Sequence, residues 1–195
     1  LWNGMILMRC WKKSIFELFG GLMKKLIRLI VGCLAAINVF MLTAFAAIPS
    51  PEVYTSVGEK SNLCEKSVKY CIKKVSSSWR RGNFFDSADV IIRDEGNGNI
   101  GASAYANLRK PVKELYVSLY LDRYNKEKDT WQQVDYVDFE YTLEEYPDGI
   151  DDPAIEITFT KQKRGYYYRI RGAFSAGDDD WYEGLGPTTD GIWIE

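Results

Sequence analysis

Hydrophobic and polar residues alternate along much of the second half of the chain, and short groups of turn residues interrupt the alternation. The clearest stretch is 113–124, where Leu115, Val117 and Leu119 alternate with tyrosine and polar residues. A period of two is typical of a strand with one face against a core. The pattern therefore predicts an all-β fold, a single antiparallel β-sandwich of about seven strands. The predicted strands are 88–94, 99–108, 113–124, 131–142, 154–160, 165–174 and 189–195.

Two local signals refine this prediction. Gly96-Asn97-Gly98 lies between the first two predicted strands, and Asn-Gly sequences readily adopt the positive φ angles of tight turns. In segment 131–142 the alternation slips, because Tyr136 belongs to one parity and Val137 to the other. A β-bulge near these two residues would restore the pattern.

The N-terminal part has a different pattern, which is typical of an export signal. Met23-Lys24-Lys25 provides a basic start, and 29–42 is an apolar run interrupted by Asn38 alone. Ala44-Phe45-Ala46 then supplies the small residues that a signal peptidase requires. We therefore expect a signal helix at 23–46 and a secreted, extracellular protein after cleavage.

Two alternatives to a cleaved signal stay open. Residues 29–47 are about long enough for an uncleaved membrane anchor, and Cys33 ends a lipobox-like Ile-Val-Gly-Cys sequence. Residues 1–22 mix apolar with basic side chains, and we expect them to be untranslated or an extended n-region. After the signal we expect a linker at 47–79 and the sandwich domain at 80–195.

Loss of the signal would change the charge of the protein. The chain has 25 basic and 27 acidic residues, of which the first 46 positions hold six and one, so 19 basic and 26 acidic residues remain, a net charge of −7. An acidic domain is not expected to bind nucleic acid or anionic lipid, and a membrane contact is expected only through an uncleaved signal. The chain has no histidine, which excludes His-dependent catalytic triads and His metal sites. We expect no cofactor.

Cys64 and Cys71 are the two cysteines that remain after the signal, and an even pair in an exported chain predicts a disulfide. The same segment has a helical spacing of apolar residues, continued by Val68, Ile72 and Val75. On one helix, residues seven apart have Cα atoms about 10.5 Å apart, whereas a disulfide tolerates about 7 Å. The two predictions exclude each other, and we favour a disulfide-closed loop over a helix.

The sequence Tyr166-Tyr167-Tyr168-Arg169, followed by a loop and a short last strand, resembles the end of fibronectin type III and related immunoglobulin-like sandwiches. From about residue 80 onward the chain also resembles a family of small secreted proteins of unknown function from Gram-positive bacteria. The matching pieces are Arg81-Gly82, the Gly96/Gly98 turn, Ala104-Tyr105-Ala106-Asn107, Val117-Ser118-Leu119-Tyr120-Leu121, Trp131, Gly165-Tyr166-Tyr167-Tyr168-Arg169, Thr188/Thr189 and Gly191-Ile192. The resemblance implies a secreted β-sandwich, and it brings no catalytic residues because the family has none assigned.

Acidic residues cluster in two loops and in principle supply oxygen ligands for calcium. Neither cluster has the spacing of an EF-hand loop, and solvated loop charge is the simpler interpretation, so we expect no metal site. Paired carboxylates also hydrolyse glycosides, but no pair is singled out by its context. The acidic loop residues are Asp148, Asp151, Asp152, Asp178, Asp179, Asp180 and Glu183, and the carboxylates considered for hydrolysis are Glu114, Glu140, Glu144 and Glu156.

Tyrosines give the better indication of a binding site. Tyr116, Tyr120 and Tyr167 are predicted to lie opposite the aliphatic rows, where neighbouring strands could assemble them into a platform for sugar rings or a protein. The alternative is that they stabilise the sheet as cross-strand pairs or face the core. Arg169 and Arg171 lie beside them and are expected to form ion pairs with acidic residues. The acidic partners available are Glu140 and Asp138.

Together these observations predict a secreted binding or interaction module without catalysis. Its expected partner is a cell-wall glycan or a surface protein. A structural or accessory secreted protein is one alternative. A secreted hydrolase that works through carboxylates alone is another, and it would require a cleft with two carboxyl groups about 5–9.5 Å apart.

Overall fold

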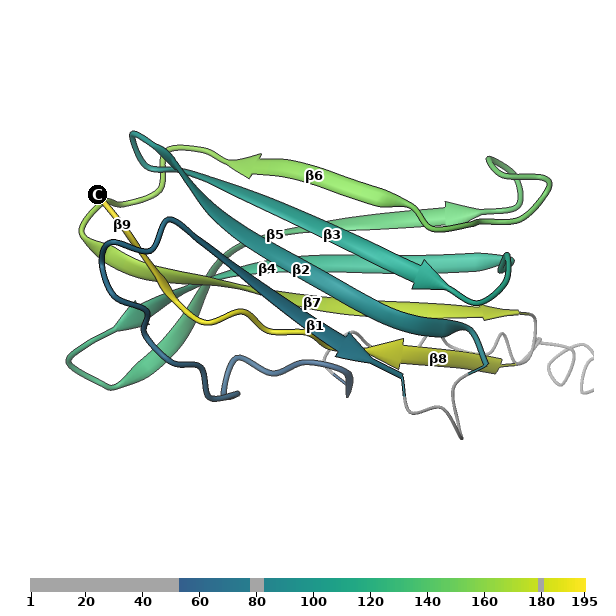
Figure 1. The fold of residues 1–195 in the computed structure, drawn as a ribbon, viewed down its shortest axis with the longest axis horizontal. Helices are drawn as coiled ribbons and strands as arrows, with labels where there is room; N and C mark the ends of the chain where they lie inside the picture. Colours follow the sequence, from purple (N-terminus) through teal and green to yellow (C-terminus); the bar gives the residue numbers. More distant parts are fainter. Residues whose placement is uncertain (1–52, 78–82, 179–180) are drawn as a thin grey trace, which may run out of the picture. The chain divides into compact units, whose positions relative to one another are not determined.

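The computed structural model describes residues 53–77, 83–178 and 181–195, and in these residues nine strands form two antiparallel sheets packed face to face (Figure 1). One sheet has the strand order β1-β2-β3-β6 and the other β5-β4-β7-β8, with β9 also paired to β7. The predicted all-β sandwich is therefore confirmed, with two strands more than expected. The strands are β1 (Tyr70–Ser76), β2 (Phe85–Gly96), β3 (Asn99–Leu108), β4 (Glu114–Asn125), β5 (Thr130–Thr142), β6 (Ala154–Phe159), β7 (Tyr166–Asp178), β8 (Trp181–Leu185) and β9 (Ile192–Ile194).

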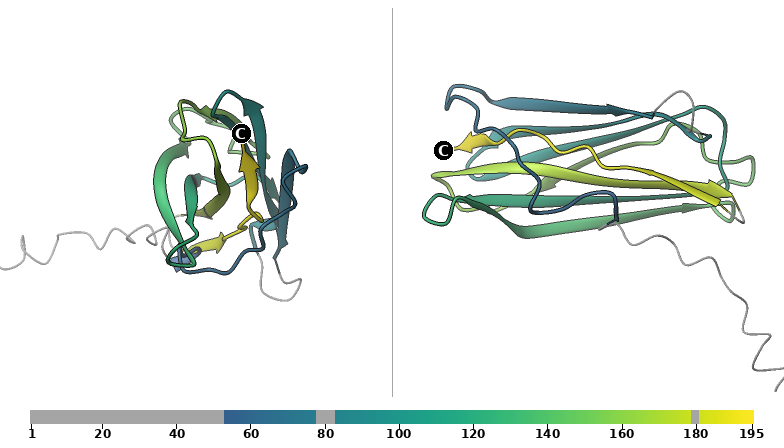
Figure 2. Two further views of the ribbon diagram at one scale, coloured as in Figure 1. Left: turned by 90° about the vertical axis from the view of Figure 1, so that its left-hand side faces the viewer. Right: turned by 90° about the horizontal axis from the view of Figure 1, so that it is seen from below.

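The two sheets face each other in the end-on view of Figure 2, and the hydrophobic core residues come from both of them. The aliphatic row of β4 and the alanine-rich row of β3 are both buried, in agreement with the alternation in the sequence. Each large aliphatic side chain buried there contributes about 1.5–3 kcal/mol to stability, because its apolar surface is removed from water. The core residues of these two strands are Ile100, Ala102, Ala104, Ala106 and Leu108, and Leu115, Val117, Leu119 and Leu121.

The turn between β2 and β3 has the predicted geometry. Gly96, Asn97 and Gly98 all have positive φ angles, of 81°, 56° and 75°. Gly98 is also required by space, because a Cβ atom at this position would lie 2.5 Å from the carbonyl oxygen of Gln162. The hairpin therefore depends on glycine at Gly98 for two independent reasons.

The predicted bulge in β5 exists, but at Val134 and not at Tyr136–Val137. Leu121 pairs with Asp135, and the next residue of β4, Asp122, pairs with Gln133, so that Val134 has no partner. Because of this extra residue, odd-numbered residues before the bulge and even-numbered residues after it point to the same face of the sheet.

Residues 70–76, predicted to be part of a linker, form β1 at the edge of the four-stranded sheet. β1 pairs with β2 over its full length, from Tyr70↔Arg93 to Ser76↔Ser87. The segment forms no helix despite its helical spacing, and both Cys64 and Cys71 are present as half-buried free thiols. The disulfide thus stays a prediction, while the helical alternative is wrong.

Residues 54–63, here called the N-terminal strap, run beside the segment 184–191 that leads into β9 (Figure 2). Backbone hydrogen bonds join Gly191 N–H to the Asn62 carbonyl and Cys64 N–H to the Gly191 carbonyl, both at 2.8 Å. The strap therefore packs against the sandwich and is not a free linker.

The predicted export signal at 23–46, its cleavage site and residues 1–22 lie outside the described residues. Within the described ranges, the structure contains no helix with the length and apolar character needed to cross a membrane.

Candidate binding surface on the five-stranded sheet

The outer face of the five-stranded sheet carries an unusual set of aromatic and charged side chains. The register places Tyr124 opposite Trp131 and Tyr120 opposite Tyr136. Trp131 and Tyr136 differ in sequence parity, so a regular strand would direct them to opposite faces of the sheet. The bulge at Val134 brings both onto the outer face.

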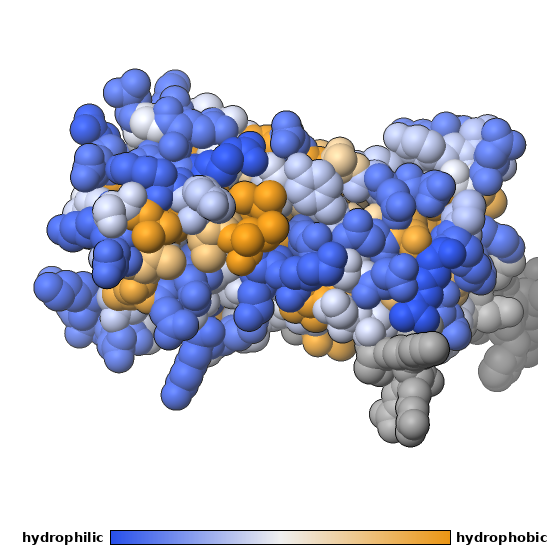
Figure 3. All heavy atoms as spheres, in the orientation of Figure 1, coloured by the Kyte–Doolittle hydropathy of each residue, from blue (hydrophilic) through white to orange (hydrophobic). Residues whose placement is uncertain are grey.

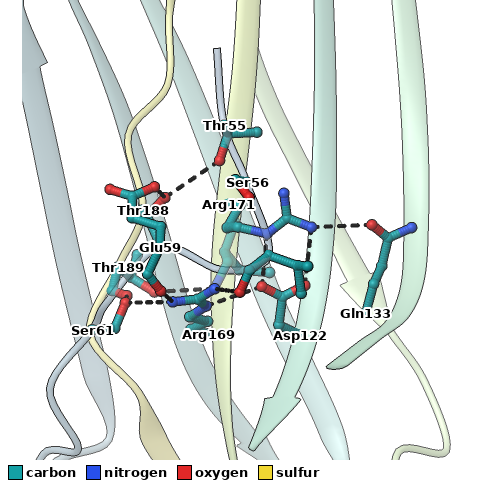
Figure 4. A network of polar contacts seen from close by, with 12 residues as sticks. Thr55, Ser56, Glu59, Ser61, Asp122, Gln133, Arg169, Arg171, Thr188 and Thr189 are labelled. Atoms are coloured by element: carbon teal, nitrogen blue, oxygen red, sulfur yellow. Dashed lines mark hydrogen bonds and ion pairs between the residues drawn. The ribbon is translucent and has the colours of Figure 1, made fainter. Parts of the chain in front are cut away.

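A buried ion triad lies at the centre of this face (Figure 4). The Asp122 carboxylate accepts hydrogen bonds from Arg169 Nε at 2.9 Å and from Arg171 Nε at 2.7 Å. Asp122 and Arg169 are 0% exposed and Arg171 is 3% exposed. The expectation that these arginines pair with Glu140 or Asp138 is therefore wrong, because the neighbouring strand that faces them is β4, where Asp122 lies opposite Arg169.

The N-terminal strap supplies the acceptors that the triad lacks. Arg169 donates to the Glu59 carbonyl at 2.6 Å, to Ser61 Oγ at 2.9 Å and to the Val57 carbonyl at 2.8 Å. A buried guanidinium requires an acceptor for each of its N–H groups, so the strap is part of the solvation shell of Arg169. Burial lowers the pKa of Arg169, and the adjacent Asp122 carboxylate opposes this shift.

Aromatic rings continue from the triad in both directions along the face. The Arg169 guanidinium lies 4.5 Å from the centre of the Trp131 ring, and Arg171 lies 4.7 Å from that of Tyr120. Trp131 in turn packs on Tyr124, with ring centres 5.3 Å apart. These cation–π contacts hold the rings in fixed positions on the sheet.

The three tyrosines proposed as a platform all lie on this face, but they do not form one surface. Tyr120 stacks on Tyr136 at 6.3 Å, whereas Tyr167 packs edge-to-face on Trp193 at 5.1 Å at the end of the sheet. The triad and the strap lie between the two groups.

Tyr116 has a different environment from the other two tyrosines. Its hydroxyl donates to Glu114 at 3.4 Å, and Glu114 also accepts a hydrogen bond from Tyr182. Burial, reinforced by the charges of Glu114 and Glu140, raises the pKa of Tyr116 to about 12. Tyr116 therefore belongs to a local hydrogen-bonded group at the opposite end of β4 from Tyr124.

Three adjoining hollows surround Tyr124 at the end of the sandwich formed by the β4–β5 turn and the start of β7. Their volumes are about 550, 690 and 540 Å³, and Tyr124 lines all three. We call the rings around them the aromatic end. The aromatic end consists of Tyr124, Trp131, Tyr166, Tyr167 and Trp193.

Cationic side chains lie against two of these rings. The Arg123 guanidinium is 5.0 Å from the centre of the Tyr166 ring, and Lys66 Nζ is 3.9 Å from that of Trp193. Volumes of this size fall within the range of about 300–1,000 Å³ that is typical of small-ligand sites. Of the predicted site residues, only Tyr167 lines one of the three hollows.

Three of the acidic loop residues, Asp152, Asp178 and Glu183, make hydrogen bonds or ion pairs that stabilise the fold. Glu183 accepts hydrogen bonds from the backbone N–H groups of Asn83 and Phe84, both at 2.8 Å, and thereby anchors the start of β2. Asp152 accepts the N–H of Leu108, and Asp178 pairs with Lys110 at 3.6 Å. Asp179 and Asp180 lie outside the described residues. In the ranges that the structure describes, no three acidic, cysteine or histidine residues gather closely enough to hold a metal ion.

Two of the four glutamates considered for hydrolysis accept hydrogen bonds away from the hollows. Glu114 binds two tyrosines, and Glu156 accepts from Ser103 and Tyr105, each at 3.4 Å. None of the four lines the hollows at the aromatic end.

Comparison with models of known protein families and with curated proteins finds no match for this chain. The structure shows the fold, and no family is identified.

Proposed function

We propose that this chain is a secreted, non-catalytic binding module that holds a glycan at the aromatic end. The observation that supports this most directly is the gathering of five aromatic rings around three adjoining hollows. The C–H faces of sugar rings pack on aromatic rings, and sugar hydroxyls need polar partners at the rim. Arg123 and Gln132 line the rim of one hollow and offer such partners.

A glycan suits this surface better than a protein does. Protein interfaces bury about 1,200–2,000 Å² and have a continuous apolar centre. The large exposed apolar residues are dispersed over different strands and loops, for example Ile72 on β1 and Tyr146 after β5. On the opposite side of the molecule, the face of the four-stranded sheet is mainly hydrophilic as well, with separate apolar patches (Figure 3).

The non-catalytic part of the proposal rests on the lack of histidine and on the positions of the glutamates, which lie away from the hollows. Secretion rests on the signal-like sequence at 23–46, and the relation to small secreted proteins of Gram-positive bacteria rests on the sequence resemblance from about residue 80. Cleavage after Ala46 would be detected as an N-terminus at Ala47 in the culture medium.

Retention on insoluble cell-wall glycans tests the function. We expect the wild-type protein to be retained and Tyr166→Ala to elute early, because Tyr166 lines two of the hollows. Tyr146→Ala is the matched control, since both tyrosines are 42% exposed and Tyr146 lies after β5, away from the hollows. If no glycan retains the wild-type protein, or if both variants lose retention equally, the proposal is contradicted. Binding to a cell-surface protein instead would make a protein, and not a glycan, the partner.

A further inference from the structure

One of the three hollows differs from the other two in charge. The hollow of about 540 Å³ is lined by two lysines and by four rings of the aromatic end, and no carboxylate of the described residues lines it. The neighbouring hollows have Glu127 in one and Glu59 and Asp129 in the other. The lysines are Lys66 and Lys126, and the rings are Tyr124, Tyr166, Tyr167 and Trp193.

The two lysines approach this hollow from different segments of the chain. Lys66 follows the strap, and its Nζ atom lies 3.9 Å from the centre of the Trp193 ring, which holds the ammonium group against the wall of the hollow. Lys126 lies in the β4–β5 turn. Asn125 Oδ1 orders this turn by accepting the N–H groups of Glu127 and Lys128, at 3.0 and 3.2 Å.

This arrangement combines apolar ring faces with two positive charges. The rest of the protein is acidic, with a net charge of −7 after residue 46, so a pair of lysines without a lining carboxylate creates a local positive potential. A neutral sugar would use the rings and leave both ammonium groups without a counter-charge. An acidic sugar would use the rings and the charges together.

We propose that this hollow binds an acidic sugar, with a pyranose ring against the tyrosine and tryptophan faces and its carboxylate or phosphate group between Lys66 and Lys126. The inference rests on the proposed function and adds the charge of the ligand to it. Exposed charge pairs are worth at most about 1 kcal/mol, so each lysine is expected to change affinity about two- to fivefold.

Titration followed by tryptophan fluorescence tests this, because Trp193 lines the hollow. The ligands are an oligogalacturonate and a neutral maltooligosaccharide of the same length, with glucose 6-phosphate against glucose to separate phosphate from carboxylate. We expect tighter binding of the acidic member of a pair, weakened by salt. Lys66→Gln and Lys126→Gln should each reduce that affinity about two- to fivefold and leave neutral binding unchanged. Lys73→Gln, an exposed lysine of β1 in the other sheet, is the control.

The outcomes separate this inference from the proposed function. Equal affinity for acidic and neutral sugars, with no effect of Lys66→Gln or Lys126→Gln, would overturn the acidic-sugar inference and leave the glycan site in place. Loss of acidic binding in Lys73→Gln as well would also overturn it, because the attraction would then come from general charge. Absence of binding to every sugar would overturn both proposals. All three variants change exposed side chains, and thermal unfolding will confirm that each is folded.

Discussion

Asp122 is the residue on which the outer face of the five-stranded sheet depends, because two buried arginines share its carboxylate. Arg169 and Arg171 both donate to Asp122 Oδ2, and all three side chains are nearly or fully inaccessible. Burying charge is unfavourable unless the charges are paired, so the single carboxylate stabilises two cations at once. Removing this carboxylate is therefore expected to destabilise the fold more than removing an exposed carboxylate does.

Asp122→Ala should lower the free energy of unfolding by about 3–5 kcal/mol, because it leaves buried guanidinium groups without a partner. Asp138→Ala is the control, since Asp138 is exposed on the same face of the sheet and is expected to change stability by less than about 0.5 kcal/mol. Urea denaturation measures both. Similar stability in the two variants would show that the triad contributes little.

Tyr116 should make stability depend on pH in the alkaline range. Its pKa rises from 10.0 to about 12 in the folded protein through burial and the nearby Glu114 and Glu140. The unfolded chain therefore loses its proton first, and stability falls as pH rises from about 10 to 12. Thermal unfolding at several alkaline pH values should show a smaller fall in Tyr116→Phe, which has no hydroxyl to ionise. An identical decline in both proteins would exclude Tyr116 as a contributor.

At the level of strands, the alternation in the sequence predicted seven of the nine elements. It identified strands whose inward rows are strongly apolar, such as β4, because burial imposes that pattern. It missed β1, where Tyr70 and Ile72 are 66% and 55% exposed, since an edge strand needs no apolar face and its lysines suit solvent. It also missed β8, which has only five residues and includes Gly184.

The strap was predicted as linker because its own residues carry no periodic signal. Its position is determined by partners more than 100 residues away, such as Arg169 and Gly191, which no local pattern reveals. Glycines opposite the strap give the clearest sign of close packing. A Cβ atom at Gly184 would overlap the Tyr54 ring, and one at Gly186 would overlap the Tyr54 carbonyl.

Gly186→Ala should loosen the strap, because the added methyl group takes the space of the Tyr54 backbone. We expect a loss of stability of about 1–3 kcal/mol and faster proteolysis within residues 54–63. Gly58→Ala lies in the strap itself and is the control, since the nearest atom to an added Cβ is Ser56 Oγ at 3.6 Å. If both variants resist protease like the wild type, the strap does not depend on this contact.

For the molecule as a whole, the sequence predicted the face of the sheet used by the candidate site better than the position of the site. Parity placed Tyr120 and Tyr167 on one face, but parity does not say which strands are neighbours or what lies between two residues. The aromatic end needed Trp193 from the last strand and Trp131 from beyond a bulge, and these residues reach Tyr167 and Tyr124 only after the five-stranded sheet is assembled. The sequence signal that could have indicated the aromatic end is the high frequency of tyrosine and tryptophan near turns.

The predicted disulfide would join two parts of the sandwich. Cys64 follows the strap beside the β9 segment, whereas Cys71 lies in β1 of the other sheet. Burial and the neighbouring Cys71 raise the pKa of the Cys64 thiol, which keeps it protonated and slow to react at neutral pH.

We expect protein recovered from an oxidising medium to have lost two hydrogens, and the bond to stabilise the fold by about 2 kcal/mol. Intact mass before and after reduction measures the bond, and Cys64→Ser serves as the reference for unfolding. Two thiols that label freely in the unreduced, denatured protein would refute the prediction.

The separation in sequence between the strap and its partners determines when the strap can fold. The strap precedes all nine described strands, yet its partners Thr188, Thr189 and Asp190 are separated from it by 128–133 residues. While the chain is being synthesised, the strap lacks these partners until residues 188–190 have emerged from the ribosome. The first described residues to be synthesised are thus among the last to reach their folded position, because their docking requires residues 188–190.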